Sequence, residues 1–147
     1  MKICLTASPG GHLTELLLFA PVYRQHDVFL ISNDWPRVRS MTMRKYLMPL
    51  FSRNVLLLFP ALMIAFNALW HERPQAVIST GAEVALPVFF IARILGIKTI
   101  FIETCTRFHN PTLTGRLAYW LSNRFYVQNK ETLPCYGRRA EWYGGLL

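Results

Sequence analysis

The sequence is poor in acidic side chains and in cysteine, and both shortages restrict its function. Eight Asp and Glu stand against sixteen Lys and Arg. The resulting net charge of +8 attracts phosphate-bearing partners: nucleic acid, anionic lipid headgroups or a diphosphate substrate. Three dispersed cysteines form neither a CxxC motif nor a Cys/His ligand spacing, so neither a zinc site nor a disulfide framework is supported. A reducing compartment is therefore expected.

Linkers, repeats, low-complexity stretches and two common nucleotide-binding fingerprints are also missing. The Gly10-Gly11 turn lacks the GK[ST] ending of a Walker loop and does not match GxGxxG. The first apolar run meets Pro9 too soon for the core of a signal peptide, so we expect the chain to begin in its fold, in the cytoplasm. A hydrophobic content of 52% excludes disorder, and a mean hydropathy of +0.24 predicts apolar surface that meets a membrane or a partner.

Short apolar runs alternate with helical patterns along the chain. The runs at 2–6, 27–31, 75–79, 98–102 and 124–128 predict strands, and the segments at 13–20, 54–70, 84–95 and 112–122 predict helices. Residues 36–53 and the tail after 128 show no regular pattern. The alternation predicts an α/β fold, a Rossmann-like parallel sheet with flanking helices, in one domain over residues 1–147.

Residues 54–70 lack charge and reach the lower length limit for a membrane-spanning helix. Spanning would place the strands at 27–31 and 75–79 on opposite sides of the bilayer, which one sheet does not allow. Two readings remain: a plain crossover helix, or a crossover helix whose outer face sits among lipid headgroups together with the basic segment 37–53. We favour the second and expect a membrane-associating segment at about 37–70.

Polar, ligand-capable segments follow three of the predicted strands. They are Ala7 to His12, Ser79 to Glu83, and Glu103 to Arg107. Because the carboxyl ends of parallel strands share one edge of a sheet, these segments are expected to line one cleft.

Each segment has a functional and a plainer structural interpretation. Ser8, Gly10 and Gly11 suit a phosphate or diphosphate at a helix start, although any tight turn can use glycine. His12 is a candidate general base or a candidate hydrogen-bond donor to phosphate, or else a polar cap at the helix start. Thr80, Gly81 and Glu83 could line a pocket in which the carboxylate contacts a sugar hydroxyl. Alternatively, the charge of Glu83 only stabilises the start of the following helix. Glu103 ends a buried strand and needs a cleft or a partner, and Arg107 is either that partner or a diphosphate ligand.

These motifs, with Pro74 through Pro87, Leu113 to Leu117 and Tyr143-Gly144-Gly145, occur in the order of a known family. The chain resembles PssD-type exopolysaccharide proteins and the membrane-anchoring subunit of the bipartite UDP-GlcNAc transferase of N-glycan assembly. Both are similar to the N-terminal half of a MurG-like GT-B glycosyltransferase. The chain is also long enough for only one of the two Rossmann-like domains of a GT-B enzyme.

The resemblance implies an acceptor-binding, membrane-associated subunit of a two-chain inverting glycosyltransferase, inactive alone. It would act on a polyprenyl-diphosphate-linked sugar at the cytoplasmic face of the inner membrane, as a peripheral or monotopic protein. A separate PssE-like subunit would bind the UDP-sugar. His12 or Glu103 would be the base, and Ser8, Gly10, Gly11 and Arg107 would hold the diphosphate, beside a sugar pocket of Thr80, Gly81 and Glu83. No cofactor is implied, and no metal, since the sequence has no DxD motif.

Three other classes compete with this interpretation. The first is a non-catalytic anchor that only recruits the donor-binding subunit to the membrane. The second is a nucleotide-binding domain acting alone; Asp34 lies in an Asp-Trp-Pro turn, which argues weakly against NAD. The third is a nucleic-acid module, which explains the charge but neither the apolar helix nor the glycine turn, so no nucleic-acid partner is expected.

Overall fold

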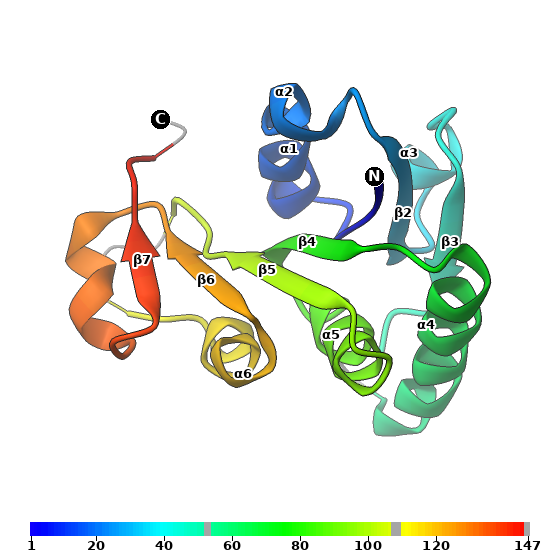
Figure 1. The fold of residues 1–147 in the computed structure, drawn as a ribbon. Coiled ribbons are helices and arrows are strands. Elements are labelled where there is room, and N and C mark those ends of the chain that lie inside the picture. Colours follow the sequence, from blue (N-terminus) through cyan, green and yellow to red (C-terminus); the bar gives the residue numbers. More distant parts are fainter. Residues whose placement is uncertain (52–53, 107–109, 146–147) are drawn as a thin grey trace.

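A computed structural model describes residues 1–51, 54–106 and 110–145 of the chain. Its strands form one seven-stranded sheet in the order β3-β2-β1-β4-β5-β6-β7, and every neighbouring pair is parallel (Figure 1). The strands are β1 (Lys2–Ala7), β2 (Asp27–Asn33), β3 (Lys45–Met48), β4 (Ala76–Gly81), β5 (Lys98–Ile102), β6 (Arg124–Val127) and β7 (Ala140–Trp142). The predicted Rossmann-like fold is confirmed.

Helices cover the sheet on both faces. On one face lie α4 (Leu58–Glu72), α5 (Ala85–Ile94) and α6 (Leu113–Leu121), and on the other lie α1 (Gly11–Leu18) and α2 (Ala20–Tyr23) (Figure 1). The short α3 (Pro36–Arg39) packs with α1 through Val38. Two 3-10 helices, η1 (Val55–Leu57) and η2 (Lys130–Cys135), precede α4 and β7. Because β1, β2 and β4 have side chains in the cores on both faces of the sheet, they read as continuous apolar runs in the sequence.

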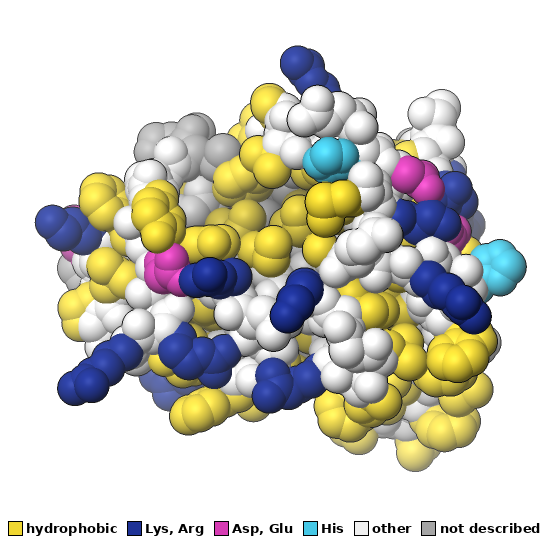
Figure 2. Space-filling view, viewed as in Figure 1, with side chains coloured by type: hydrophobic (Ala, Val, Ile, Leu, Met, Phe, Trp, Pro, Cys, Tyr) yellow, Lys and Arg dark blue, Asp and Glu magenta, His cyan; other side chains and the backbone are white. Residues whose placement is uncertain are grey.

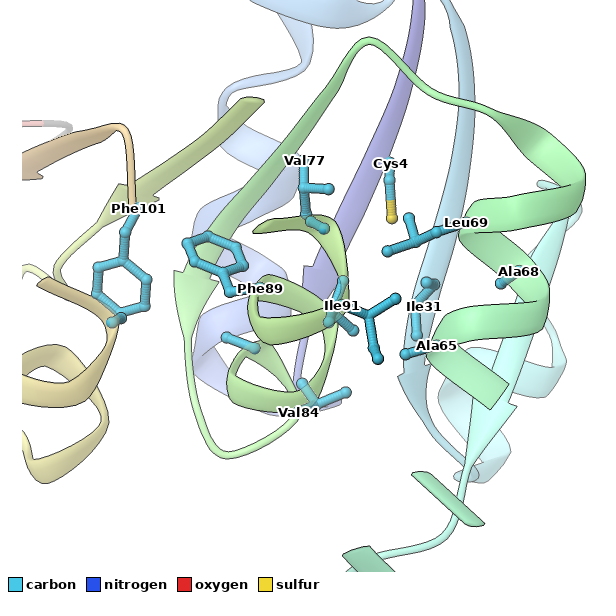
Figure 3. Close-up of a cluster of buried hydrophobic side chains, with 14 of the residues drawn as sticks. Cys4, Ile31, Ala65, Ala68, Leu69, Val77, Val84, Phe89, Ile91 and Phe101 are labelled. Atoms are coloured by element: carbon cyan, nitrogen blue, oxygen red, sulfur yellow. The ribbon is translucent and has the colours of Figure 1, made fainter. Parts of the chain in front are cut away.

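The larger core lies between the sheet and the α4–α6 layer (Figure 3). Along α4, Ala61, Ala65 and Ala68 are buried, and these small side chains let the helix approach the sheet and α5 closely. The second core packs Leu13 and Leu16 of α1 against the strands on the opposite face. The two cores fix the sheet and so fix the positions of its carboxyl-end loops.

Three sequence expectations need correction. Residues 36–53 contain α3 and the edge strand β3, which pairs with Leu30–Asn33. The tail contains η2 and β7, which pairs with β6. Both strands are only three or four residues long, too short to show an alternating pattern. The helix expected over 13–20 is two helices that meet at Phe19, because Pro21 begins a new helix near its start.

Val55–Glu72 is the stretch within the described residues that is long and apolar enough to span a bilayer by length and composition. It nevertheless connects β3 and β4, which belong to the same sheet, and its alanine face is part of the core. The helix therefore lies along the sheet, as the sequence argument from topology requires.

Candidate functional site

The order of the strands reverses between β1 and β4, and in such sheets the ligand crevice lies outside the carboxyl ends at that point. The segment after β1 and the end of β4 contact each other here. His12 Nδ1 lies 2.8 Å from the carbonyl oxygen of Thr80, and Thr80 Oγ1 donates to the carbonyl oxygen of His12 at 2.6 Å. The structure thus brings together His12, Thr80 and Gly81 from two of the predicted segments.

The contact with Thr80 determines which nitrogen of His12 is protonated. A carbonyl oxygen only accepts hydrogen bonds, so Nδ1 of the half-buried ring carries the proton. In the neutral imidazole the lone pair is then on Nε2. His12 is accordingly oriented as a group that accepts a proton through Nε2.

Gly81 makes room for this ring. Its φ is +118°, and a Cβ built on it would lie 3.0 Å from His12 Nδ1 and 3.1 Å from Cε1. Any side chain here would push the imidazole away from the Thr80 carbonyl. The sequence predicted Gly81 only as a lining residue of a sugar pocket, and its contact with His12 is an additional role.

The glycine turn is closed by the helix start and by an arginine. The carbonyl oxygen of Ser8 accepts from the amide of Leu13 at 3.1 Å, and Gly10 is the N-cap of α1 without a side-chain hydrogen bond. Arg37 of α3 donates through Nη1 to the carbonyl oxygens of Pro9 and Gly10, at 3.2 and 3.3 Å, and to Thr14 Oγ1 at 3.0 Å. A guanidinium therefore stands beside the amide groups that begin α1, and the sequence analysis had assigned it to the membrane segment.

Glu103 follows β5 and is only 1% exposed. Its carboxylate accepts hydrogen bonds from the hydroxyl of Tyr136, from Thr112 Oγ1 at 3.1 and 3.2 Å, and from the amide of Thr104 at 3.0 Å. Burial, and then the hydrogen bond to Glu103, raises the pKa of Tyr136. A Cβ at Gly115 would overlap the Glu103 carboxylate and the Tyr136 hydroxyl. The carboxylate thus joins the end of β5 to Thr112 at the start of α6 and to Tyr136 just after η2. The sequence did not predict this hydrogen-bond network.

Three buried oxygens lack a hydrogen-bond partner among the described residues: Thr6 Oγ1, Asn33 Oδ1 and Glu83 Oε1. Each residue lies near or just after the carboxyl end of β1, β2 or β4. Buried oxygens of this kind normally have a donor from protein, water or ligand. Glu83, predicted to contact a sugar hydroxyl, therefore presents an acceptor at the correct edge of the sheet.

Arg107 lies outside the described residues, so its pairing with Glu103 and its diphosphate contact stay predictions. Within the described part of the chain, no three His, Cys, Asp or Glu side chains are grouped so that they could hold a metal ion.

Two apolar surfaces accompany the crevice. The first, here called the sheet-face groove, has a volume of about 410 Å³ and lies on the α1–α2 side, between Phe19 and Val22 and the exposed sides of β5 and β6. Tyr143, Gly144 and Gly145 complete it, and Figure 2 shows hydrophobic side chains in this hollow. In Figure 1, α1 and α2 leave this part of the sheet uncovered.

The second surface, here called the helix face, lies on the opposite side of the sheet. It consists of exposed apolar side chains of η1, α4, α5 and α6, and Figure 2 shows part of it over α4. Its most exposed members are Val55, Leu56, Phe59, Trp70, Phe90, Ile94, Leu113 and Trp120.

Comparison with known proteins identifies the family of this chain. The family model described as "Oligosaccharide biosynthesis protein Alg14 like" matches residues 36–146. The chain belongs to this Alg14-like family. The matched range includes Glu103 and β4 through β7, whereas the glycine turn and His12 precede it.

Curated proteins that are similar to the chain carry the ALG14 name. The "UDP-N-acetylglucosamine transferase subunit ALG14" of Eremothecium gossypii is 33% identical over 95 residues, which cover 60% of this chain and 42% of that protein. The protein of the same name from Candida albicans is 33% identical over 86 residues, 54% of this chain and 39% of that protein. The chain spans less than half the length of either relative.

Solved structures show the same fold at low identity. MurG of Acinetobacter baumannii superposes with a TM-score of 0.79 at 17% identity, covering 98% of this chain and 46% of that chain. UDP-GlcNAc 2-epimerase from Neisseria meningitidis, bound to UDP-GlcNAc, gives a TM-score of 0.76 at 12% identity, covering 99% and 47%. The Alg14-like chain therefore has the fold of one half of a GT-B protein. Since a MurG and an epimerase share this half, the fold alone does not select the reaction.

Proposed function

We propose that this chain is the acceptor-binding, membrane-associated subunit of a two-chain inverting glycosyltransferase. The complex would transfer a sugar from a UDP-sugar to a polyprenyl-diphosphate-linked acceptor in the synthesis of a polysaccharide, with exopolysaccharide as the product class. The Alg14-like family and the relatives named as UDP-GlcNAc transferase subunits support the reaction class.

The observation that carries the proposal is the orientation of His12. Nδ1–H is held by the Thr80 carbonyl at the crevice, beside the glycine turn, and Nε2 is the proton acceptor. In the proposed step Nε2 takes the proton of the acceptor hydroxyl while its oxygen attacks the anomeric carbon of the donor. The bond to UDP breaks, UDP leaves on the partner's side, and a single displacement inverts the configuration.

The remaining residues bind the acceptor in this proposal. The amides at Gly10 and Gly11, with Ser8 and Arg107, hold the diphosphate, and the guanidinium of Arg37 adds positive charge at the same turn. Thr80, Gly81 and the unpartnered Glu83 oxygen line the sugar pocket. Glu103 is the alternative base, but its buried carboxylate already accepts four hydrogen bonds from three residues.

In this proposal a separate subunit supplies the other half of the GT-B active site, and the names of the curated relatives as transferase subunits support this. The chain covers only 46% of the similar MurG chain. We propose that a PssE-like, UDP-sugar-binding subunit supplies the other half and covers the sheet-face groove. The position of the groove supports this, since its apolar side chains lie on uncovered strands beside the last described residues.

Membrane association of the segment 37–70 is proposed through the part of it that lies on the helix face, in η1 and α4, whereas α3 packs on the opposite side of the sheet. Val55, Leu56 and Phe59 are 81%, 83% and 71% exposed, and the net charge of +8 favours an anionic surface. The cytoplasmic face of the inner membrane is the proposed location, with attachment from one side.

The test compares His12→Ala with Glu103→Gln in the reconstituted complex. Loss of a general base lowers the rate by about 100-fold or more, so His12→Ala is expected to lose transfer while retaining lipid and partner binding. Glu103→Gln is expected to lower thermal stability and retain transfer. Full activity of His12→Ala, with loss only in Glu103→Gln, would make Glu103 the base.

A non-catalytic anchor is the second candidate, favoured by one observation. The family match begins at residue 36, so His12 and the glycine turn are not part of it. In that case both variants would transfer sugar at the wild-type rate, and only membrane recruitment of the partner would depend on this chain.

A further inference from the structure

A second carboxylate lies beside the crevice, on the same helix as His12. Glu15 is three residues further along α1 and only 8% exposed. Its Oε1 accepts from Thr104 Oγ1 at 2.7 Å and from Cys105 Sγ at 3.1 Å, and its Oε2 accepts from Gln128 Nε2 at 3.3 Å. One side chain of α1 thus joins the residues that follow β5 and those that follow β6.

The residues that Glu15 contacts are themselves connected. Gln128 Nε2 also donates to the carbonyl oxygen of Glu103 at 3.1 Å, and Asn129 Nδ2 donates to that of Cys105 at 2.7 Å. Burial, and then the contact with Glu15, raises the pKa of Cys105 to about 11, so its thiol stays protonated as a donor. The segment 103–105 is therefore held between Glu15 and residues 128–129.

This connection matters because α1 cannot fix its own orientation. It has eight residues and an N-cap without a side-chain hydrogen bond, and a helix of two turns is marginal in isolation. Three polar side chains of α1 supplement its buried leucines: His12 contacts the end of β4, Thr14 contacts Arg37, and Glu15 contacts the segments after β5 and β6. Glu15 makes the longest-range of these contacts, and its loss removes the polar connection of α1 to the segments after β5 and β6.

We propose that Glu15 is a positioning residue that keeps the His12 ring on the Thr80 carbonyl with Nε2 facing the acceptor. This inference rests on the proposed function only for the role of Nε2 as the general base; the effect of Glu15 on the His12 tautomer does not depend on it. The plainer alternative is that Glu15 contributes to stability alone. Glu72 offers a matched comparison, because it is a buried carboxylate at the opposite edge of the sheet, held by Lys2, Tyr46 and Arg44.

The experiment reads the tautomer of His12 directly by nitrogen NMR of the full chain labelled in histidine, with His12→Gln to assign the signal. Wild type is expected to show Nδ1–H. Glu15→Ala is expected to show a mixture of the Nδ1–H and Nε2–H tautomers. Glu72→Gln is expected to keep the wild-type tautomer, even if its melting temperature falls by as much as that of Glu15→Ala. Glu15→Gln, which retains an acceptor oxygen, is expected to restore Nδ1–H in large part.

Transfer by the reconstituted complex is measured on the same variants. Misplacement of a reacting group by about 1 Å costs about 100-fold, so Glu15→Ala is expected to lower kcat by that order with the KM for the UDP-sugar unchanged. If Glu15→Ala does not fold, Glu15→Asp, one methylene too short to join all three donors, carries the same expectation. An Nδ1–H tautomer and a wild-type kcat in these variants would overturn the inference. An inactive wild-type complex would instead contradict the proposed function, and the tautomer would still decide the role of Glu15.

Discussion

At the scale of single residues, the crevice depends on a glycine whose missing side chain leaves space for a histidine. Gly81 combines a positive φ with a close approach to the His12 ring. Gly96 also has a positive φ, of +72°, but nothing lies within 4 Å of its hypothetical Cβ. Substitutions at the two glycines therefore distinguish the effect of backbone strain on stability from the effect of a side chain on the position of His12.

Gly81→Ala and Gly96→Ala are both expected to lose about 1 kcal/mol of stability, because an L-residue is strained at positive φ. Only Gly81→Ala is expected to displace the imidazole and reduce sugar transfer strongly. Thermal unfolding and transfer assays on both variants check this. Equal activity of the two variants would mean that Gly81 serves the backbone alone.

The limits of sequence analysis are clearest at this scale. His12, Gly81 and Thr80 could be predicted to lie together, since each follows a predicted strand and parallel strands share one carboxyl edge. Arg37 could not, because its contact with Gly10 spans 27 residues of sequence and depends on how α3 packs beside α1. Glu15 could not be predicted for a related reason: its partners are 89 to 113 residues away, and no spacing in the sequence links them to it.

At the scale of elements, the amino edge of the sheet is fixed by a charge cluster around the buried carboxylate of Glu72. Glu72, at the end of α4, accepts hydrogen bonds from Lys2 Nζ at 3.0 Å and Tyr46 at 2.9 Å, and lies 2.9 Å from Arg44 Nε. Burial alone raises the pKa of Glu72, but these partners outweigh it, and the pKa is lowered. The cluster therefore stabilises the fold when Glu72 is ionised.

This lowered pKa predicts a dependence of stability on pH. A carboxyl with a lower pKa in the folded state stabilises the protein fully above its unfolded pKa, about 4.3 for Glu, and loses this contribution as pH falls through the folded pKa. Glu72→Gln is expected to cost about 2 kcal/mol at pH 7 and progressively less below about pH 4. Denaturant unfolding of both proteins between pH 3 and 7 checks this; a constant difference would contradict it.

The helix face is the second element-scale feature, and its exposure makes it testable without disturbing the core. A triple variant, Val55→Ser, Leu56→Ser and Phe59→Ser, removes side chains that contact little of the protein. Because a buried large apolar side chain contributes about 1.5–3 kcal/mol, the triple variant is expected to bind anionic vesicles at least tenfold more weakly.

The control for the vesicle measurement is Leu18→Ser with Val22→Ser. These residues are also exposed, at 52% and 63%, but belong to α1 and α2 on the other face of the sheet. The control is expected to bind vesicles like wild type in the absence of a partner. Equal losses in both variants would show that vesicle binding does not select the helix face.

The elements themselves were predictable to different degrees. The five central strands, and α4, α5 and α6, could be located because long apolar runs and helical spacing mark them. The edge strands β3 and β7 could not, since three or four residues in mostly half-buried positions carry no periodic pattern. The outward face of α4 was anticipated, but its continuation over α5 and α6 depends on tertiary packing.

At the scale of the whole molecule, the chain has the fold of one half of a GT-B protein. Its uncovered sheet-face groove and its helix face lie on opposite sides of the sheet. This arrangement allows a partner to bind on one side while the membrane contacts the other. The size of the molecule was predictable from its length, whereas the two separate surfaces were not, because residues from several elements form each of them.

We propose that this chain supplies acceptor chemistry to a split glycosyltransferase. The direct measurement is transfer of radiolabelled sugar from UDP-sugars, UDP-GlcNAc first, to membrane lipid by this chain alone, by a donor-binding partner alone, and by both. Transfer is expected only from the mixture, and it is expected to be lost when this chain carries His12→Ala. Transfer by the partner alone, merely increased at membranes by this chain and unchanged by His12→Ala, would contradict this proposal.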